Sequence, residues 1–117
     1  MATIQDFGKR ILQIPGITQY LLVRNDGKVM AHNVDAPESL ASVILFCGLN
    51  CDAIGSVAGL TYLKYLMLTR KNNEKLLIFP MDTYFLGIIQ NADAYSPEIV
   101  DSVIRLVQMV IKPKKTS

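Results

Sequence analysis

The strongest constraint on the fold is a long segment, Glu38 to Leu60, that has the composition of a helix but almost no charge. No charged residue lies between Glu38 and Asp52, and none follows Asp52 until Lys64. A helix at the surface of a globular domain normally shows an apolar stripe opposite a charged face. This helix therefore needs cover on more than one side.

Helical spacing separates the apolar residues of this segment into two sets. The set expected to face a sheet is Leu40, Ile44, Cys47, Cys51 and Ile54, and the set pointing elsewhere is Leu45, Phe46, Leu49, Ala53 and Val57. In water the second set would form an apolar patch of the kind that usually marks an interface. The alternative is a helix buried in its own core, but a chain of 117 residues lacks the second layer that this requires. We therefore expect the second set to pack on another copy of the chain, because two-fold symmetry lets one helix face pack on itself.

Length and charge limit the possible classes of protein. The 117 residues predict a single domain, residues 1–112, followed by a flexible basic tail, residues 113–117. The net charge is +2, but three lysines cluster at or near that tail, so the folded body is close to neutral and lacks a nucleic-acid footprint. The N-terminus lacks the apolar run of a secretory signal, and polar residues such as Asn50 and Asp52 interrupt the neutral helix. We expect a cytoplasmic protein without a membrane span.

Periodicity and breaker residues predict three helices. The first has Ile4, Phe7, Ile11 and Leu12 at helical spacing and ends before Pro15 and Gly16. The neutral helix begins at a predicted capping box, Asp35 to Glu38, and ends between Ser56 and Leu60. The last helix begins at Ser96 and ends before Pro113, and its predicted apolar face is Val100, Val103, Ile104, Val107 and Ile111.

Five strands are expected, at residues 17–24, 28–33, 61–70, 75–81 and 84–91. The first two should form a hairpin, because the Asp-Gly of the turn at 25–27 supplies the positive φ angles of a tight turn. In the strand at 61–70, Lys64 and Arg70 share a face with Leu66 and Leu68, which is typical of an edge strand. The prediction is an α+β fold of order α-β-β-α-β-β-β-α, with the terminal helices on one face of an antiparallel sheet and the long helix on the other.

The residues that could carry chemistry are few and scattered. His32 is the only histidine and lies at a hairpin end, and the acids lie at caps and turns. No phosphate-binding loop is present, because the stretch "VAGLTYLK" lacks the required glycine and Lys-Ser/Thr pair. Cys47 and Cys51 are too few for a closed zinc site, although a site built from two copies stays open, and buried packing in a reducing compartment explains them. We expect no catalytic residues, metal or cofactor.

With its order of elements, Gly16, the turn "NDG" at 25–27 and the run Leu86, Gly87 and Ile88, the chain resembles the roadblock/LC7 family over nearly its whole length. The resemblance implies a five-stranded sheet of order 2-1-5-4-3. It also implies homodimers, or heterodimers with a paralogue, in which the third strands pair edge to edge and the long helices pack together. Members of this family act as regulators or scaffolds of small Ras-like GTPases.

Two functions follow as hypotheses. The first is a dimeric scaffold for a small GTPase, with Arg24 and Arg70 as candidate partner contacts. Its expected dimer interface is Leu45, Phe46, Leu49, Ala53, Val57, Tyr62, Lys64, Leu66 and Leu68. The second is a small-molecule sensor with a pocket between helix and sheet, lined by Tyr20, Tyr84 and Met67, although ordinary core packing also explains these three residues.

Overall fold

The structure, a computed structural model, describes residues 4–58, 65–70, 72–81, 83–94 and 96–111, and within the helices it describes no side chains at 51–58 and 109–111. The elements follow in the order α1 (Ile4–Leu12), β1 (Ile17–Arg24), β2 (Val29–His32), α2 (Pro37–Ala58), β3 (Leu66–Thr69), β4 (Lys75–Pro80), β5 (Tyr84–Gln90) and α3 (Ser96–Ile111). This order confirms the predicted one.

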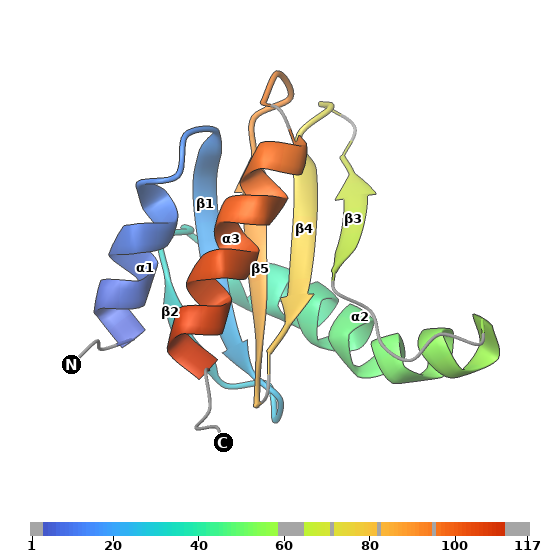
Figure 1. The fold of residues 1–117 in the computed structure, drawn as a ribbon. Coiled ribbons are helices and arrows are strands. Elements are labelled where there is room, and N and C mark those ends of the chain that lie inside the picture. The colour runs from blue at the N-terminus through green and yellow to red at the C-terminus, as the bar shows by residue number, and fades with distance from the viewer. Residues whose placement is uncertain (1–3, 59–64, 71, 82, 95, 112–117) are drawn as a thin grey trace.

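The five strands form one antiparallel sheet of order β2-β1-β5-β4-β3. Helices α1 and α3 lie on one face of this sheet and α2 lies on the other (Figure 1). The predicted fold class is therefore confirmed, including the strand order. Because β2 and β3 are the outer strands, each has one edge without a neighbouring strand in the described sheet.

The hairpin between β1 and β2 forms with a different turn from the predicted one. Gly27 has a φ of 97°, and in the described residues of the turn it is the one residue with positive φ. Its N–H donates to the Arg24 carbonyl (2.8 Å), and the Arg24 N–H donates to the Lys28 carbonyl (2.8 Å). A turn with a single left-handed glycine at its end belongs to longer hairpin loops, whereas the tight two-residue turn needs two positive φ angles.

On the face covered by α1 and α3, large apolar side chains are buried between the helices and the sheet. Phe7 and Ile11 of α1 and Val103 of α3 are buried against Leu22, Phe79, Leu86 and Ile88 of the sheet. The stripe of α3 differs from the predicted one, because Ile99 and Leu106 are buried while Val100 and Ile104 are only partly buried. The prediction for Leu12 was also wrong, since this residue is exposed and the apolar face of α1 is narrower than expected.

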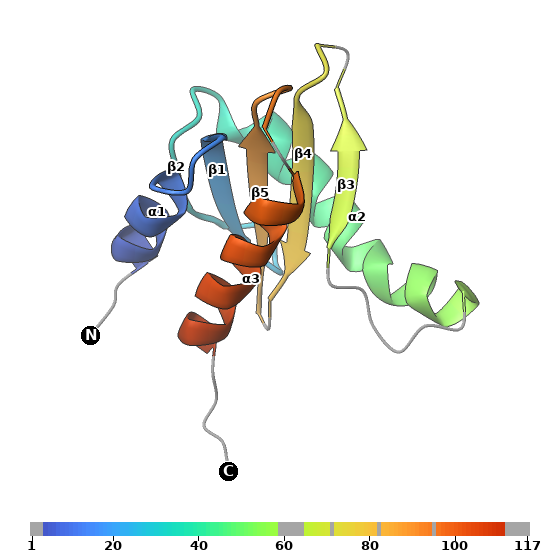
Figure 2. The same cartoon turned by 45° about the horizontal axis from the view of Figure 1, so that its top comes forward.

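Among the described elements, α2 is the one that covers the other face, and it crosses the sheet at a slant and runs past the edge strand β3 (Figures 1 and 2). Ile44 and Ala41 are buried against Leu21, Val23, Ile78, Phe85 and Ile89. Two glycines allow this close approach. Gly48 of α2 lies over the Phe85 ring, where an added Cβ would be 2.7 Å from Cδ1, and Gly87 of β5 lies directly under Ile44.

Two local predictions differ from the structure. The predicted strand at 61–70 is described as β3 only for Leu66–Thr69, and residues 61–64 lie outside the described part of the chain. Helix α2 begins at Pro37 as expected, but in the described N-terminal region the hydrogen bonds include none from the side chains of Asp35 and Glu38. The predicted capping box therefore does not form.

Candidate interaction surface

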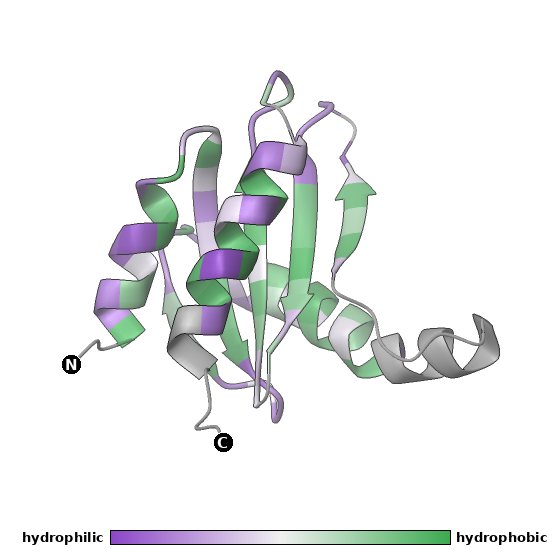
Figure 3. Cartoon of the chain, viewed as in Figure 1, coloured by the Kyte–Doolittle hydropathy of each residue, from purple (hydrophilic) through white to green (hydrophobic). Residues whose placement is uncertain are grey.

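The outward face of α2 is apolar and exposed over its described side chains. The exposed fractions of Val43, Phe46 and Leu49 are 43%, 70% and 57%. The described part of α2 is hydrophobic along nearly its whole length, whereas α3 alternates hydrophilic and hydrophobic residues (Figure 3). Single exposed apolar residues are normal on a protein surface, but three on one helix form a patch that needs an explanation.

The residues of the predicted dimer interface do not all lie on one exposed face. Phe46 and Leu49 are on the exposed face, whereas Leu45 is half-buried and packs against the core beneath α2. The side chains of Ala53 and Val57 and the whole of Tyr62 and Lys64 lie outside the described residues. Sequence reasoning missed Val43, although its position three residues before Phe46 is a signal of a shared helix face.

The edge strand β3 continues this apolar surface. Its register with β4 pairs Leu66 with Ile78 and Leu68 with Leu76, so both leucines lie on the α2 side of the sheet. Leu66 is half-buried and Leu68 is exposed. We refer to Val43, Phe46 and Leu49 of α2 together with Leu68 of β3 as the α2–β3 surface. An unpaired strand edge beside an apolar patch is a template for pairing with another chain.

A cavity of about 450 Å³ lies beside this surface, between the first turns of α2 and the sheet. Its apolar floor includes the buried side chains of Leu76 and Ile89, and its rim carries Asp35, Ser39 and Arg70. Helix α2 is slanted (Figure 1) and leaves a hollow beside its first turns, although Leu76 and Ile89 beneath the hollow are themselves buried. We call this cavity the open corner.

The two candidate arginines lie at opposite ends of the sheet. Arg24 pairs in register with Tyr84 at the start of β5, whereas Arg70 follows Thr69, which lies beside Lys75 at the other end. The Arg24 guanidinium binds Asp26 through Nη2–Oδ2 (2.6 Å) and Nε–Oδ1 (3.0 Å). These bonds and the Lys28 N–H lower the Asp26 pKa to about 2. Arg70 Nη1 lies 3.6 Å from Glu74 Oε1.

The three residues predicted to line a ligand pocket do not come together. Tyr20 is buried beneath α1 close to Gly8, and this burial raises the pKa of its hydroxyl. Tyr84 packs against the same core, on the face away from α2. Met67 is exposed on β3, with β5 and β4 between its strand and β1. The residue assignment of the sensor hypothesis is therefore wrong.

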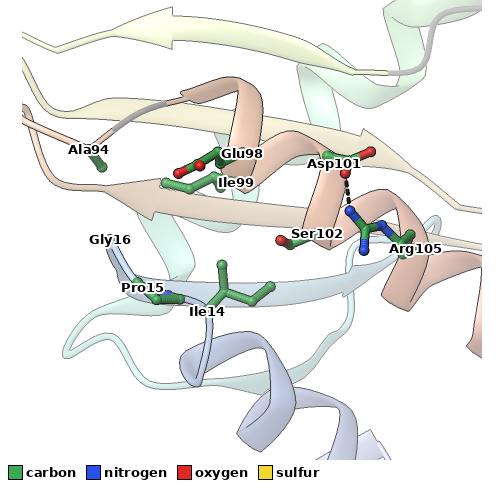
Figure 4. A pocket seen from close by; sticks show the side chains of 9 residues that line it. All are labelled: Ile14, Pro15, Gly16, Ala94, Glu98, Ile99, Asp101, Ser102 and Arg105. Carbon is green, nitrogen blue, oxygen red and sulfur yellow. Dashed lines mark hydrogen bonds and ion pairs between the residues drawn. The ribbon is translucent and has the colours of Figure 1, made fainter.

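A second cavity, of about 550 Å³, lies on the opposite face between the α1–β1 loop and α3 (Figure 4). Its walls include Pro15, Gly16 and Ala94, together with Glu98 and the ion pair of Asp101 with Arg105. The buried Gln90 lies nearby, and its Nε2 donates to the Ala94 carbonyl (3.3 Å). Two carboxylates and a guanidinium that is already paired give this cavity no clear preference for one charge of ligand.

Side chains that could bind a metal ion or exchange a proton do not cluster in the described residues. In the described residues no three His, Cys, Asp or Glu side chains come together in a way that could hold a metal ion. His32 Nδ1 accepts a hydrogen bond from the Val34 N–H (3.2 Å), a local contact at the end of β2. Within these residues no helix has the length and apolar character that crossing a membrane requires.

Solved structures with the same fold include roadblock/LC7 proteins. The Streptomyces avermitilis roadblock/LC7 domain superposes with a TM-score of 0.71 at 16% identity, covering 93% of this chain and 95% of that domain. Myxococcus xanthus MglB gives 0.73 at 12% identity with coverages of 91% and 86%, and MglB in a tetrameric arrangement gives 0.75 at 15% with 91% and 83%. No protein-family model matches the sequence, and no curated protein matches it significantly.

The fold is also found in other proteins. Acanthamoeba castellanii profilin IB superposes with a TM-score of 0.61 at 18% identity, covering 88% of this chain and 91% of the profilin. The roadblock/LC7 and MglB structures superpose more closely. This chain therefore has a roadblock/LC7-like fold. At such identities the similarity concerns the fold alone, and function has to be argued from the surface.

Proposed function

We propose that this chain is a non-enzymatic, cytoplasmic interaction module that forms a homodimer through the α2–β3 surface and docks or regulates a small Ras-like GTPase. The observation that carries the proposal is Phe46, an aromatic side chain 70% exposed on a helix whose outward face has no charge from Ser39 to Cys51. Removing such a side chain from water contributes about 1.5–3 kcal/mol before the cost of association.

Two features support self-association as the use of this surface. A two-fold axis perpendicular to the sheet at the edge of β3 would pair β3 with its symmetry mate and bring both α2 helices onto the same side. The fold itself is compatible with assembly, because one neighbour is MglB in a tetrameric arrangement. A paralogous roadblock protein is the alternative partner for the same surface.

The GTPase is proposed from the resemblance to the roadblock/LC7 family and from the shared fold. Arg24 is the candidate contact on this chain, because it lies at the tip of the exposed hairpin and its guanidinium is held by Asp26. Binding that reshapes the switch loops of the GTPase would not need an arginine in the active site.

The dimer is tested first, by sedimentation velocity of the wild-type chain and of Phe46→Glu. We expect a wild-type dimer and a folded Phe46→Glu monomer, because a carboxylate is solvated on the exposed helix but would be buried unpaired in the dimer. Leu12→Glu is the matched control, since Leu12 is an exposed apolar residue on the opposite face of the sheet. A wild-type monomer at high concentration, or a dimeric Phe46→Glu, would overturn the proposed interface.

The GTPase is tested by isothermal titration of the dimer with purified small Ras-like GTPases of the same organism, loaded with GDP or with a non-hydrolysable GTP analogue. We expect binding to one of them in one nucleotide state. Arg24→Ala should weaken that binding while the dimer remains intact. Failure of every such GTPase to bind a confirmed dimer would reject the partner and leave the dimer standing.

The second candidate function is a small-molecule sensor. The open corner favours it, because a cavity of about 450 Å³ with an apolar floor and a charged rim has the features of a ligand site. A metabolite that raises the melting temperature of a monomeric chain would support this function against the first.

A further inference from the structure

A third cavity, of about 400 Å³, lies between α1 and α3, next to the one that Figure 4 draws. The walls that the two cavities share are Ile14, Pro15, Ser102 and Arg105. The cavity in Figure 4 also has two carboxylates in its wall. The third cavity instead has two guanidiniums, those of Arg10 and Arg105, and no carboxylate among the described residues that line it. We call it the α1–α3 cavity, and its charge favours an anion.

Its polar side chains come as two pairs from helices that are far apart in the sequence. Ser102 and Arg105 are three residues apart on α3, a spacing that places both on one face of the helix. Arg10 and Gln13 have the same spacing at the end of α1. The Gln13 N–H donates to the Arg10 carbonyl (3.2 Å), so the helical turn continues to Gln13. The buried apolar sides of α1 and α3 hold both pairs in place on the sheet.

Most of the hydrogen-bond donors of these four side chains are unused. In the described part of the chain, the side chains of Arg10, Gln13 and Ser102 have no hydrogen-bond or ion-pair partner. Arg105 Nη2 binds Asp101 Oδ2, and the other N–H groups of this guanidinium are left over. Both residues of this ion pair are exposed, and exposed pairs of this kind contribute little to stability. A ligand can therefore share Arg105 with Asp101 at low cost.

We propose that the α1–α3 cavity binds the phosphate group of a phosphomonoester. Such a group carries a charge between about −1.5 and −2 at neutral pH and has three acceptor oxygens, so it suits two guanidiniums better than a single carboxylate does. The guanidinium fork binds phosphate through two parallel bonds, and the Ser102 hydroxyl and the Gln13 amide supply further donors. The remaining walls, Ile14, Pro15 and Leu106, are apolar and suit the organic part of the ligand.

Amide chemical shifts of the chain titrated with phenyl phosphate test the site, at about 0.15 M ionic strength so that unspecific attraction is screened. We expect saturable changes at Gln13 and Ser102. Arg10→Gln and Arg105→Gln should each raise the dissociation constant about tenfold, because each removes charge-assisted hydrogen bonds to the phosphate. Lys9→Gln is the matched control, since it removes the same charge from a neighbouring exposed side chain that does not line the cavity.

Two further ligands test the chemical class. Benzenesulfonate keeps the ring but carries a single charge, and it should bind at least about tenfold more weakly than phenyl phosphate. Inorganic phosphate should also bind more weakly, because it lacks the ring. The absence of saturable shifts, or equal affinity for the sulfonate and the phosphate, would overturn the proposal. An equal loss of affinity in Lys9→Gln and Arg10→Gln, both shown to be folded by circular dichroism, would overturn it as well, because the attraction would then be that of diffuse surface charge.

The same titration distinguishes two sources of the phosphate. A phosphoserine peptide that binds more tightly than O-phosphoserine would support the site and identify a phosphorylated protein as the source. Equal binding would support the site and identify a small phosphorylated molecule.

The test is independent of the proposed dimer, because the α1–α3 cavity lies on the face of the sheet away from the α2–β3 surface (Figure 1). Phe46→Glu should therefore bind phenyl phosphate with the wild-type affinity. A wild-type monomer that binds phenyl phosphate would overturn the proposed interface and support this site. A wild-type dimer that binds no phosphate would overturn this site and leave the proposed function standing.

Discussion

The two faces of the sheet differ in how completely the helices that cover them are buried. On one face, α1 and α3 each bury a single apolar stripe, and the large side chains beneath them, such as Phe79 and Leu86, are withdrawn from water. On the other face α2 buries one side and exposes another, so that Phe46 is 70% exposed while Phe79 is 2% exposed. The difference shows that an apolar residue is buried within one copy of the chain only where another layer of the same chain covers it.

Charge distinguishes the faces as clearly as burial does. The outer surfaces of α1 and α3 carry Lys9, Arg10, Glu98, Asp101 and Arg105, which keep those helices soluble on their outer side. Helix α2 has no charge from Ser39 to Cys51. The centre of a protein interface is depleted of charged residues relative to ordinary protein surface. The outward side of α2 shows the same depletion over several turns.

The largest expected effect comes from truncating the buried phenylalanine. Phe79→Ala should lower the free energy of unfolding by about 3–5 kcal/mol, because it removes a buried ring that stacks on Tyr65 with the centroids 5.7 Å apart. Phe46→Ala should change the stability of the monomer by less than about 0.5 kcal/mol, because the ring is solvated there. Urea unfolding at protein concentrations low enough to dissociate the proposed dimer measures both.

This pair of variants tests whether Phe79 and Phe46 differ in burial within a single copy. Equal losses in Phe79→Ala and Phe46→Ala at low protein concentration would mean that Phe46 is buried within a single copy. The α2–β3 surface would then be part of the core, and the argument for a second copy would fail. At higher concentration Phe46→Ala should lose stability that the dimer supplies to the wild type, since association stabilises the folded state by mass action.

A smaller effect is expected where α2 touches the sheet. Replacing a glycine by alanine inside a helix normally stabilises it by about 0.5–1 kcal/mol. Gly48→Ala should instead destabilise the chain by about 1–3 kcal/mol, because its Cβ would lie 2.7 Å from Cδ1 and Cγ of the buried Phe85 ring. Thermal unfolding monitored by circular dichroism checks the sign, with the exposed Ser42→Ala as control. A stabilised Gly48→Ala would show that α2 can lift off the sheet at little cost.

Much of the fold follows from short-range signals in the sequence. The strand Ile17–Arg24 was predicted with its observed bounds, because Pro15 and Gly16 precede it and a turn with Gly27 follows it. The start of α2 was predicted from the proline at its first position, even though the capping bonds expected beside it do not form. Breaker residues act locally, so their effect survives without knowledge of the tertiary structure.

The slant of α2 could not be predicted from its sequence. Helical spacing put Leu45 on the outer side, but the tilt turns it partly onto the core, where it also packs against Gly27 of the hairpin. The same tilt creates the open corner, whose residues come from distant parts of the chain such as Gln19, Val34 and Arg70. Crossing angles depend on the side chains of both packed surfaces, and one element does not contain that information.

The two edge strands, β2 and β3, are expected to differ in hydrogen exchange, and a substitution of Asn33 tests this. At the β2 edge, Asn33 ties the end of the hairpin to β1, since its Oδ1 accepts from the Tyr20 N–H (2.8 Å) and its Nδ2 donates to the Thr18 carbonyl (3.2 Å). Asn33→Ala should cost about 1 kcal/mol, the usual net worth of such bonds, and should increase hydrogen exchange in β2 but not in β3. Equal exchange at both edges would show that β2 is no better protected than β3.

The smallest effect is expected at the charged tip of the hairpin, which contrasts with the charge-free stretch of α2 from Ser39 to Cys51. Because Arg24 and Lys28 hold the Asp26 carboxylate in its charged form, its pKa in the folded chain is about 2, and Arg24→Gln should bring it back toward 3.8. A lowered pKa in the folded state stabilises the chain above the pKa of the unfolded state, and this stabilisation is lost as the pH falls through about 2. Both side chains are solvent-exposed, so the contribution to stability should be slight and screened by salt. Carboxyl-carbon NMR titration of the wild type and of Arg24→Gln measures the shift directly, and an ordinary pKa in the wild type would mean that the pair is broken in solution, leaving Arg24 free for a partner.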